Sequence, residues 1–288
     1  MKVWIDGRVV AGDAARLPVT DHGLLYGDGV FEGIRVYGRR VFRLDDHLER
    51  LAVSARAIGL TLPLERDALR DVVLTTARAY GEADAYVRLI VTRGDGALGV
   101  DPTTCKEPRV ICIVDEVRIY PESKRLHGID LVTVSWRRPA LDALDPRVKS
   151  LNYLNSVLAK LEARERGADE ALILNAAGSV AEAAVANVFA VRAGVLRTPP
   201  PTDGALEGIT RRSVLELAAS LGIPAFEASL ARVDLLAADE VFLTGTGARL
   251  VAVRSLDGQA IGAGGVGPVT RQIEEAYDAL VEQLGTPL

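Results

Sequence analysis

One lysine stands where an extended segment meets a predicted helix. Lys149 follows residues 146–148 and precedes a run with helical spacing. That run carries an apolar stripe, which we expect to be buried, of Leu151, Leu154, Leu158 and Leu161. Burial at such an edge of the core lowers the pKa of a lysine, and a neutral amine can attack an aldehyde to form a Schiff base. Taken alone, however, a lysine beside a helix start is more often a solvated surface residue.

A second candidate is a carboxylate in an apolar run. Glu182 lies in "SVAEAAVANVFAV" and is the only charged residue between Glu170 and Arg192. A carboxylate on an apolar strand needs a cationic or hydrogen-bonding partner unless it faces water at a strand edge, and the pattern leaves both readings open. In the first case Glu182 could hold a protonated pyridine nitrogen, the contact that lets pyridoxal phosphate act as an electron sink.

Two further stretches could bind an anion. "LEGITRRS" places Gly208, Ile209 and Thr210 at a predicted helix N-terminus, where backbone N–H groups and the helix dipole favour a phosphate. "TGTG" places the Thr246 hydroxyl in a tight loop between two glycines. Each stretch alone is also compatible with ordinary helix capping or turn formation. Together with Lys149 and Glu182 they indicate a phosphate-bearing cofactor.

Composition excludes several classes of protein. The chain has 288 residues, 49% of them hydrophobic, a formal net charge of -5 and a pI of about 5.4. It has no run of basic residues, so we expect no nucleic-acid binding. No apolar run approaches the roughly 18 residues that span a bilayer, and the N-terminus has no signal-peptide core. We therefore expect a soluble, cytoplasmic protein without membrane contact.

Cysteine and histidine usage indicates no metal site. Cys105 and Cys112 fit neither a CxxC motif nor a zinc ligand set, and we expect them to be reduced. The three histidines, His22, His47 and His127, are far apart in the sequence.

The hydrophobic pattern predicts a mixed α+β fold without a regular βαβ alternation, so a doubly wound parallel sheet is not expected. "KVWIDGRVVAG" predicts a hairpin about Asp6-Gly7, and helices are expected from Asp45 to Gly59 and over residues 65–80. The predicted domains are a small α+β domain at 1–119, a linker at 120–125 and a large cofactor-binding domain at 126–288.

A glycine motif near residue 265 has a simpler explanation than its pattern suggests. Gly262, Gly264 and Gly267 satisfy GxGxxG before a helix that starts at Pro268, which resembles a dinucleotide fingerprint. No second strand or distant acidic residue follows to complete a βαβ unit. We interpret the stretch as a loop that starts a helix.

The motifs, in this order, resemble those of the fold-type IV pyridoxal-phosphate enzymes and, among them, the branched-chain amino acid aminotransferases. The resemblance runs nearly end to end, through "DHGLLYGDGVFEGIRVY", "HLERL", "YVRLIVTRGDGALGVDP", "VKSLNYLNSVLAK", "GSVAEAAVANVFAV", "LEGITR", "DEVFLTGTGA" and "GPVTR". It implies a two-domain fold, pyridoxal 5'-phosphate as cofactor, and a homodimer or larger homo-oligomer.

The resemblance also implies roles for individual residues. Lys149 would form the internal aldimine and move a proton between substrate and cofactor, while Glu182 would hold the pyridinium nitrogen and Tyr153 the phenolic oxygen. The phosphate would lie among Arg50, Thr246 and the helix start at Gly208, Ile209 and Thr210. The substrate pocket would comprise Tyr26, Phe31, Gly33, Arg35, Tyr86, Arg88, Thr246 and Gly247. Tyr86 and Arg88 are two residues apart on a predicted strand and so share one face.

The implied reaction is transamination in two half-reactions. A branched-chain L-amino acid (leucine, isoleucine or valine) would leave as its 2-oxo acid, and 2-oxoglutarate would then become L-glutamate, with ping-pong kinetics. The small molecules are the expected partners.

The match departs from the family after Glu182, and three alternatives remain open. Where the family has Glu-Gly-x-Gly-x-Asn, this chain has alanine and valine at Ala183 and Val185, which lack the access of glycine to positive φ. A D-amino acid aminotransferase would be expected to have an Arg-x-His pair soon after "VTRG", which is missing between Asp95 and Thr104. An aminodeoxychorismate lyase would share Lys149, and a non-catalytic binding protein of the same fold is the remaining alternative.

Overall fold

The computed structural model describes residues 1–117 and 120–288, and the chain forms two compact units. The N-terminal unit comprises Met1–Arg118, Val148–Asn152 and Val281–Leu288, and the C-terminal unit comprises Ile119–Arg147 and Tyr153–Leu280. Residues 118 and 119, at the division, lie outside the described residues. Each predicted domain is one continuous stretch of the chain. The units of the structure differ from this prediction, because Val148–Asn152 and Val281–Leu288 belong to the N-terminal unit.

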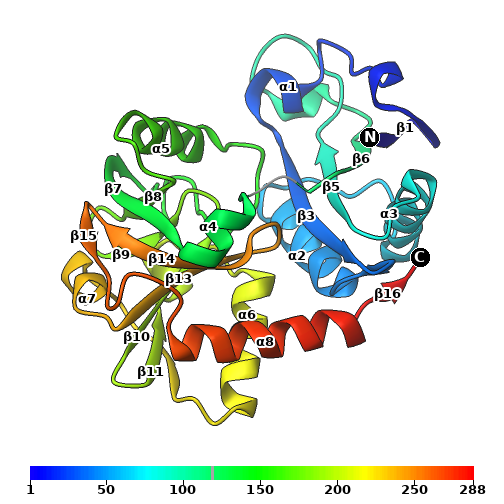
Figure 1. The fold of residues 1–288 in the computed structure, drawn as a ribbon. Coiled ribbons are helices and arrows are strands. Elements are labelled where there is room, and N and C mark those ends of the chain that lie inside the picture. Colours follow the sequence, from blue (N-terminus) through cyan, green and yellow to red (C-terminus); the bar gives the residue numbers. More distant parts are fainter. Residues whose placement is uncertain (118–119) are drawn as a thin grey trace. The chain divides into compact units, whose positions relative to one another are not determined.

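The N-terminal unit contains an antiparallel sheet with the strand order β16-β4-β3-β5-β6-β1-β2 (Figure 1). Its strands are β1 (Lys2–Ile5), β2 (Arg8–Ala11), β3 (Gly29–Tyr37), β4 (Arg40–Val41), β5 (Ala85–Thr92), β6 (Arg109–Asp115) and β16 (Thr286–Pro287). The hairpin predicted at Asp6-Gly7 joins β1 to β2, and both turn residues have positive φ (50° and 80°), as a two-residue hairpin turn of type I′ requires.

Two helices cover one face of this sheet. They are α2 (Leu44–Ala57) and α3 (Arg66–Tyr80), and their apolar residues form one core with Val30, Ile34 and Val36 of β3. Because side chains alternate along a strand, the odd-numbered residues of β3 point to the other face. The expected N-cap, Asp45, lies inside α2, because the chain enters the helix through Arg43 in the left-handed conformation.

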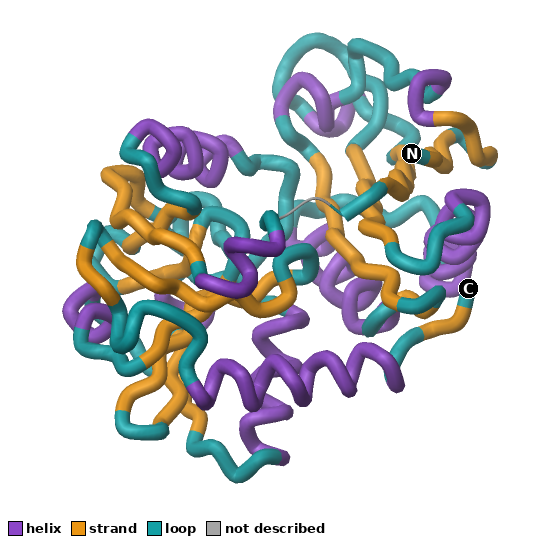
Figure 2. The backbone as a smooth tube through the Cα atoms, viewed as in Figure 1, coloured by secondary structure: helices purple, strands orange, loops and turns teal. Residues whose placement is uncertain are grey.

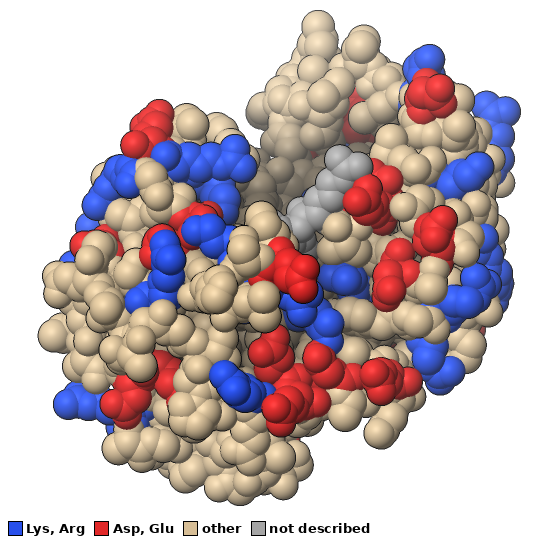
Figure 3. All heavy atoms as spheres, viewed as in Figure 1, with Lys and Arg blue, Asp and Glu red and all other residues tan. Residues whose placement is uncertain are grey.

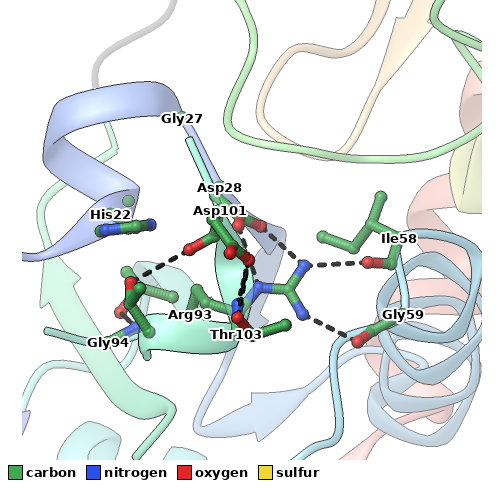
Figure 4. A network of polar contacts seen from close by, with 12 residues as sticks. His22, Gly27, Asp28, Ile58, Gly59, Arg93, Gly94, Asp101 and Thr103 are labelled. Atoms are coloured by element: carbon green, nitrogen blue, oxygen red, sulfur yellow. Dashed lines mark hydrogen bonds and ion pairs between the residues drawn. The ribbon is translucent and has the colours of Figure 1, made fainter. Parts of the chain in front are cut away.

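An arginine ties together three loops of the same unit (Figure 4). Arg93, just after β5, binds both carboxylate oxygens of Asp28, with Nε and Nη2 each 2.9 Å from an oxygen. The same guanidinium donates to the carbonyl oxygens of Ile58 and Gly59 at the end of α2, at 2.8 and 2.7 Å. The short helix α1 (His22–Tyr26) and the turns η1 (Gly12–Ala14) and η2 (Pro102–Thr104) complete the unit. Arg93 thereby fixes the start of β3 against the end of α2.

The C-terminal unit is built on a mixed sheet with the order β12-β11-β10-β13-β14-β7-β8-β9, and β15 pairs with β14. Its strands are β7 (Ile129–Arg137), β8 (Glu170–Leu174), β9 (Val180–Ala183), β10 (Asn187–Arg192), β11 (Val195–Thr198), β12 (Ala225–Glu227), β13 (Glu240–Gly245), β14 (Arg249–Leu256) and β15 (Gln259–Ala260). Among the described strands of this sheet, the pairs β7–β8, β7–β14 and β11–β12 are parallel and the remaining pairs are antiparallel, as expected for a fold that is not doubly wound.

The helices of this unit differ from the sequence expectation in two ways (Figure 2). They are α4 (Glu122–His127), α5 (Leu154–Glu165), α6 (Ile209–Ser220), α7 (Arg232–Leu236) and α8 (Pro268–Gln283), with the turn η3 (Pro201–Asp203). Helix α4 occupies most of the predicted linker. The expected burial of the leucine stripe is wrong, because α5 packs on β7 and β8 through its small residues Ser156, Ala159 and Ala163, which leaves Leu154 and Leu161 exposed.

The GxGxxG loop starts α8, and a carboxylate already caps that helix. Glu240, which is buried, accepts from the backbone N–H groups of Val269 and Thr270 at 3.0 and 2.7 Å. A side chain on Gly267 would collide with this carboxylate. An internal anion therefore occupies the amides that a nucleotide phosphate would need.

On the face drawn in Figure 3, Lys and Arg are interspersed with Asp and Glu. Within the described part of the chain, no helix is both long enough and apolar enough to cross a membrane.

We predict that Arg93→Lys destabilises the protein. A lysine cannot donate in a fork to Asp28 and also reach two carbonyl groups, so we expect a loss of about 2 to 4 kcal/mol in the free energy of unfolding. The check is urea unfolding beside Arg78→Lys, on the exposed face of α3. Equal stability of the two variants would contradict the proposed role of the clamp.

Candidate active site

In the N-terminal unit, the open face of β3 gathers five of the predicted substrate residues. Phe31, Gly33 and Arg35 alternate along β3. Gly33 pairs with Arg88 of β5, and Arg35 pairs with Tyr86. Because directly opposed residues in an antiparallel ladder share a face, all five lie on the side of the sheet that α2 and α3 do not cover. The prediction that Tyr86 and Arg88 share one face is confirmed.

Side chains on this face make close contacts. The Tyr86 hydroxyl lies over Gly33, where a Cβ atom would be only 2.0 Å from it. The Arg88 guanidinium lies 4.4 Å from the centre of the Phe31 ring, and its Nη2 atom is 3.4 Å from the Tyr86 hydroxyl. The face thus combines the Phe31 ring, the Tyr86 phenol and the Arg88 guanidinium around a glycine.

Lys149 belongs to this face through its backbone. Its carbonyl oxygen accepts the N–H of Phe31 at 3.0 Å, and the N–H of Leu151 donates to Gly29 at 2.9 Å, so residues 149–151 pair with the start of β3. On the other side, the Lys149 N–H donates to the Ser54 hydroxyl of α2 at 3.1 Å. The Lys149 amine lies 4.4 Å from the centre of the Phe31 ring. The half-buried lysine is therefore fixed at its main chain and borders an aromatic wall.

Arg50, the predicted phosphate ligand, lies on α2 and contacts the covered face of β3. Its Nε and Nη2 atoms each lie 2.7 Å from one oxygen of Glu32, and His47 Nδ1 lies 2.7 Å from Glu32 Oε2. Burial alone would raise the pKa of Glu32, but Arg50 and His47 outweigh it and lower the pKa to about 2. Burial is the largest cause lowering the pKa of His47; Glu32 opposes it, while Arg50 and Lys149 add to it. Glu32 is therefore ionised and His47 neutral near pH 7.

Tyr26 lies at the end of α1 and contacts the loop after β5. Its hydroxyl accepts the N–H of Gly99 at 2.8 Å, and its ring packs edge-on against His22 with 4.9 Å between centroids. The contact with Gly99 holds the loop after β5 against α1.

In the C-terminal unit, Glu182 is buried on β9 and has three donors. Arg138 donates to Oε1, and Oε2 accepts from Asn187 Nδ2 and from the N–H of Leu206, both at 3.1 Å. The reading of Glu182 as a strand-edge residue facing water is therefore wrong for this structure.

Arg138 and Asn187 are site residues that sequence reasoning missed. Arg138 is buried directly after β7 and also donates to the Ser156 hydroxyl at 3.2 Å, at the start of α5. The Asn187 amide bridges Glu182 and the Leu206 carbonyl. Their signals were the arginine pair "RR" after a strand and the asparagine that the family motif retains. Tyr153 is the N-cap residue of α5, the same helix end that Arg138 contacts.

The two predicted anion-binding stretches lie close to Asn187. Gly208 is the N-cap residue of α6, and a Cβ atom there would lie 2.1 Å from Asn187 Oδ1. Ile209 and Thr210, both buried, form the first turn of α6. Asn187 pairs with Thr244 of β13, the strand that leads into the loop of Thr246 and Gly247.

That loop also adjoins the turn in which the chain departs from the family motif. A Cβ atom on Gly245 would lie 3.4 Å from the Val185 carbonyl oxygen. The Thr244 hydroxyl is buried and has no hydrogen-bond partner among the described residues. None of the described residues 183–186 has positive φ, so Ala183 and Val185 adopt their conformations without backbone strain.

Comparison with known proteins decides the family. The model of the amino-transferase class IV family matches residues 29–256. The chain belongs to the class IV aminotransferases. A protein of Methanocaldococcus jannaschii, provisionally named a branched-chain-amino-acid aminotransferase, is 47% identical over 277 residues, which cover 96% of this chain and 95% of that protein.

Solved structures of class IV aminotransferases agree with this assignment. The branched-chain amino acid aminotransferase of Escherichia coli has a TM-score of 0.94 and 38% identity, with 97% of this chain and 94% of that chain covered. The branched-chain amino acid aminotransferase of Thermobaculum terrenum, solved in its PLP-form, has a TM-score of 0.87 and 32% identity, with 97% and 93% covered. The predicted fold-type IV architecture is therefore confirmed.

The buried pair of Arg138 and Glu182 leads to a stability prediction. Arg138→Met leaves the Glu182 carboxylate buried without its cation, and we expect a loss of about 3 to 5 kcal/mol in the free energy of unfolding. The double variant Arg138→Met, Glu182→Gln removes the uncompensated charge and should lose less. Urea unfolding checks this, with Arg197→Met on an exposed position of β11 as control. A double variant less stable than Arg138→Met would contradict the pairing.

Proposed function

We propose that this class IV aminotransferase transfers the amino group of branched-chain L-amino acids to 2-oxoglutarate, with pyridoxal 5'-phosphate as cofactor. The matched relatives and structures carry the name of this activity and support it. The observation that carries the proposal is the position of Lys149, whose amine borders the aromatic ring of Phe31 on the face that gathers Tyr86 and Arg88. The activity predicted from the sequence agrees with these relatives.

The residues present fit the cofactor. Pyridoxal phosphate supplies an aldehyde for an amine to attack and a pyridinium ring that withdraws electrons from the substrate Cα atom. Glu182 is a buried carboxylate that can accept from the pyridinium nitrogen, because its three internal donors leave one lone-pair position of the four. Tyr153 would donate to the phenolic oxygen.

The phosphate would be held by three kinds of donor: the Arg50 guanidinium, the amides of Ile209 and Thr210, and the Thr246 hydroxyl. The first turn of a helix offers N–H groups that lack an intrahelical partner and a dipole that favours an anion. Gly208 lets Asn187 approach that helix end closely. Each of these assignments rests on the chemistry of the residue in its own unit.

Lys149 has two tasks in this proposal. Its amine would hold the cofactor through the aldehyde group, and it would take up and return the proton of the substrate Cα atom. The backbone pairing to β3 fixes the main chain from which the Lys149 side chain extends.

The open face of β3 would accept two unlike side chains in turn. The aromatic rings of Phe31 and Tyr86 offer apolar walls for leucine, isoleucine or valine. The Arg88 guanidinium and the Tyr86 hydroxyl offer donors for the second carboxylate of glutamate. Tyr86 and the Thr246 and Gly247 amides would receive the α-carboxylate, with Gly33, Arg35 and Tyr26 completing the pocket.

The relatives favour this reading over the alternatives that the sequence left open, a D-amino acid aminotransferase, an aminodeoxychorismate lyase and a non-catalytic protein.

We also propose that the chain assembles as a homodimer or larger homo-oligomer, since the resemblance implies assembly. We propose the cytoplasm as its location, since both cysteines are free thiols.

The test is the rate of transamination of Lys149 variants. Lys149→Ala removes the amine, and Lys149→Arg keeps a cation beside Phe31 that cannot lose its proton. Both should lower kcat by at least about a thousandfold with L-leucine and 2-oxoglutarate, because covalent and proton-transfer catalysis are lost together. Lys106→Ala, at an exposed position, should keep the wild-type rate. Turnover of Lys149→Ala within tenfold of the wild type would show that another residue is the base.

A further inference from the structure

A buried carboxylate on β3 sets the orientation of the Arg50 side chain. Glu32 has no exposed surface, and its neighbours on the covered face of β3, Val30 and Ile34, belong to the apolar core. A carboxylate in such surroundings is costly unless charged or polar donors compensate it. Its presence among core residues therefore calls for a reason beyond packing.

The fork between Glu32 and Arg50 fixes the plane of the guanidinium. Nε donates to Oε1 and Nη2 to Oε2, each at 2.7 Å, so the contact is bidentate. The side chain of Arg50 is only 12% exposed. Glu32 takes the Nε and Nη2 edge, which leaves the Nη1 end of the guanidinium outside the fork.

His47 fixes Glu32 in turn. Residues 47 and 50 are three positions apart on α2 and therefore lie on one side of that helix. The neutral ring of His47 donates through Nδ1 to Glu32 Oε2 at 2.7 Å, and both side chains are buried. Glu32 consequently accepts from two residues of one helix and cannot rotate without losing a hydrogen bond.

An arginine without such a fork would lose rotational freedom when it binds a phosphate, and that loss would weaken binding. An arginine that is already ordered avoids that cost. We propose that Glu32 and His47 are positioning residues, which hold Arg50 in the orientation that receives the cofactor phosphate. This inference rests on the proposed function.

The same side of α2 carries Ser54, which accepts the backbone N–H of Lys149. A displacement of the whole helix would therefore disturb the lysine as well as the arginine. A ligand that lacks the phosphate group but still bonds to the lysine distinguishes the two cases. Its binding is weakened if the whole helix moves, and is unchanged if Glu32 and His47 act on Arg50 alone. Pyridoxal is such a ligand.

The experiment compares the affinities of apoprotein variants for pyridoxal 5'-phosphate and for pyridoxal by absorbance titration. Glu32→Gln replaces one of the two acceptor oxygens with an NH2 donor, which would face a donor of Arg50 or His47 and so breaks the fork. We expect it to weaken pyridoxal 5'-phosphate binding by about tenfold to a hundredfold, as loss of a supporting contact does in metal sites. Pyridoxal binding should stay within about twofold of the wild type. In the Arg50→Met background the change Glu32→Gln should have no further effect. The double variant Glu32→Gln, Arg50→Met should therefore bind pyridoxal 5'-phosphate no more weakly than Arg50→Met alone.

Two further variants keep the test decisive. His47→Asn retains a donor near the position of Nδ1 and should bind the phosphate ligand more tightly than His47→Ala. The matched control is Glu170→Gln, because Glu170 is also fully buried and accepts from Lys160 and Tyr120 in the C-terminal unit. The ratio of the affinities for pyridoxal 5'-phosphate and pyridoxal should be the same in Glu170→Gln as in the wild type.

Equal weakening of both ligands in Glu32→Gln, or the same effect in Glu170→Gln, would overturn the inference and leave only a structural role. So would a further loss when Glu32→Gln is added to Arg50→Met. If the wild type binds pyridoxal 5'-phosphate and Glu32→Gln binds it equally well, the inference fails and the proposed function stands. If the wild type does not bind it, the proposed function fails and the inference falls with it.

Discussion

The site depends on a short piece of backbone pairing, in which residues 149–151 bond to the start of β3 through the N–H groups of Phe31 and Leu151. These hydrogen bonds place a lysine from the middle of the chain beside a strand that begins at residue 29. Other parts of the N-terminal unit support that strand. Helix α2 covers one face of it, and the Arg93 fork fixes its start, so that its open face can present a glycine between aromatic and cationic side chains.

A second constraint recurs in both units: each has a buried glutamate paired with a buried or nearly buried arginine. Glu32 pairs with Arg50 in the N-terminal unit, and Glu182 pairs with Arg138 in the C-terminal unit. Such pairs are weak contributors to stability, since desolvation offsets most of the attraction. Their value lies in orientation, because each fixes a charged group that a cofactor with a phosphate and a pyridinium ring would contact. The proposed chemistry therefore relies on groups that are ordered before the cofactor binds.

Local patterns predicted much of the fold, whereas partners distant in sequence were not predictable. The Asp6-Gly7 hairpin, the helix start at Pro268 and the shared face of Tyr86 and Arg88 followed from turn chemistry and strand alternation. The burial of Leu154 was wrong, because periodicity shows which side of a helix is apolar and not what covers it. Arg138 was missed because it meets Glu182 across 44 residues, and no local pattern encodes that pairing. The family and fold were recognisable from motif order, while the individual site roles remain predictions.

The most direct measurement of the central claim is the visible absorption spectrum of the protein with pyridoxal 5'-phosphate, before and after separate additions of L-leucine, L-glutamate and D-alanine. The account predicts a yellow band that L-leucine and L-glutamate bleach and D-alanine leaves unchanged, because one pocket takes an apolar and an acidic L-amino acid in turn. A band that neither L-leucine nor L-glutamate changes, or no band at all with added cofactor, would contradict it.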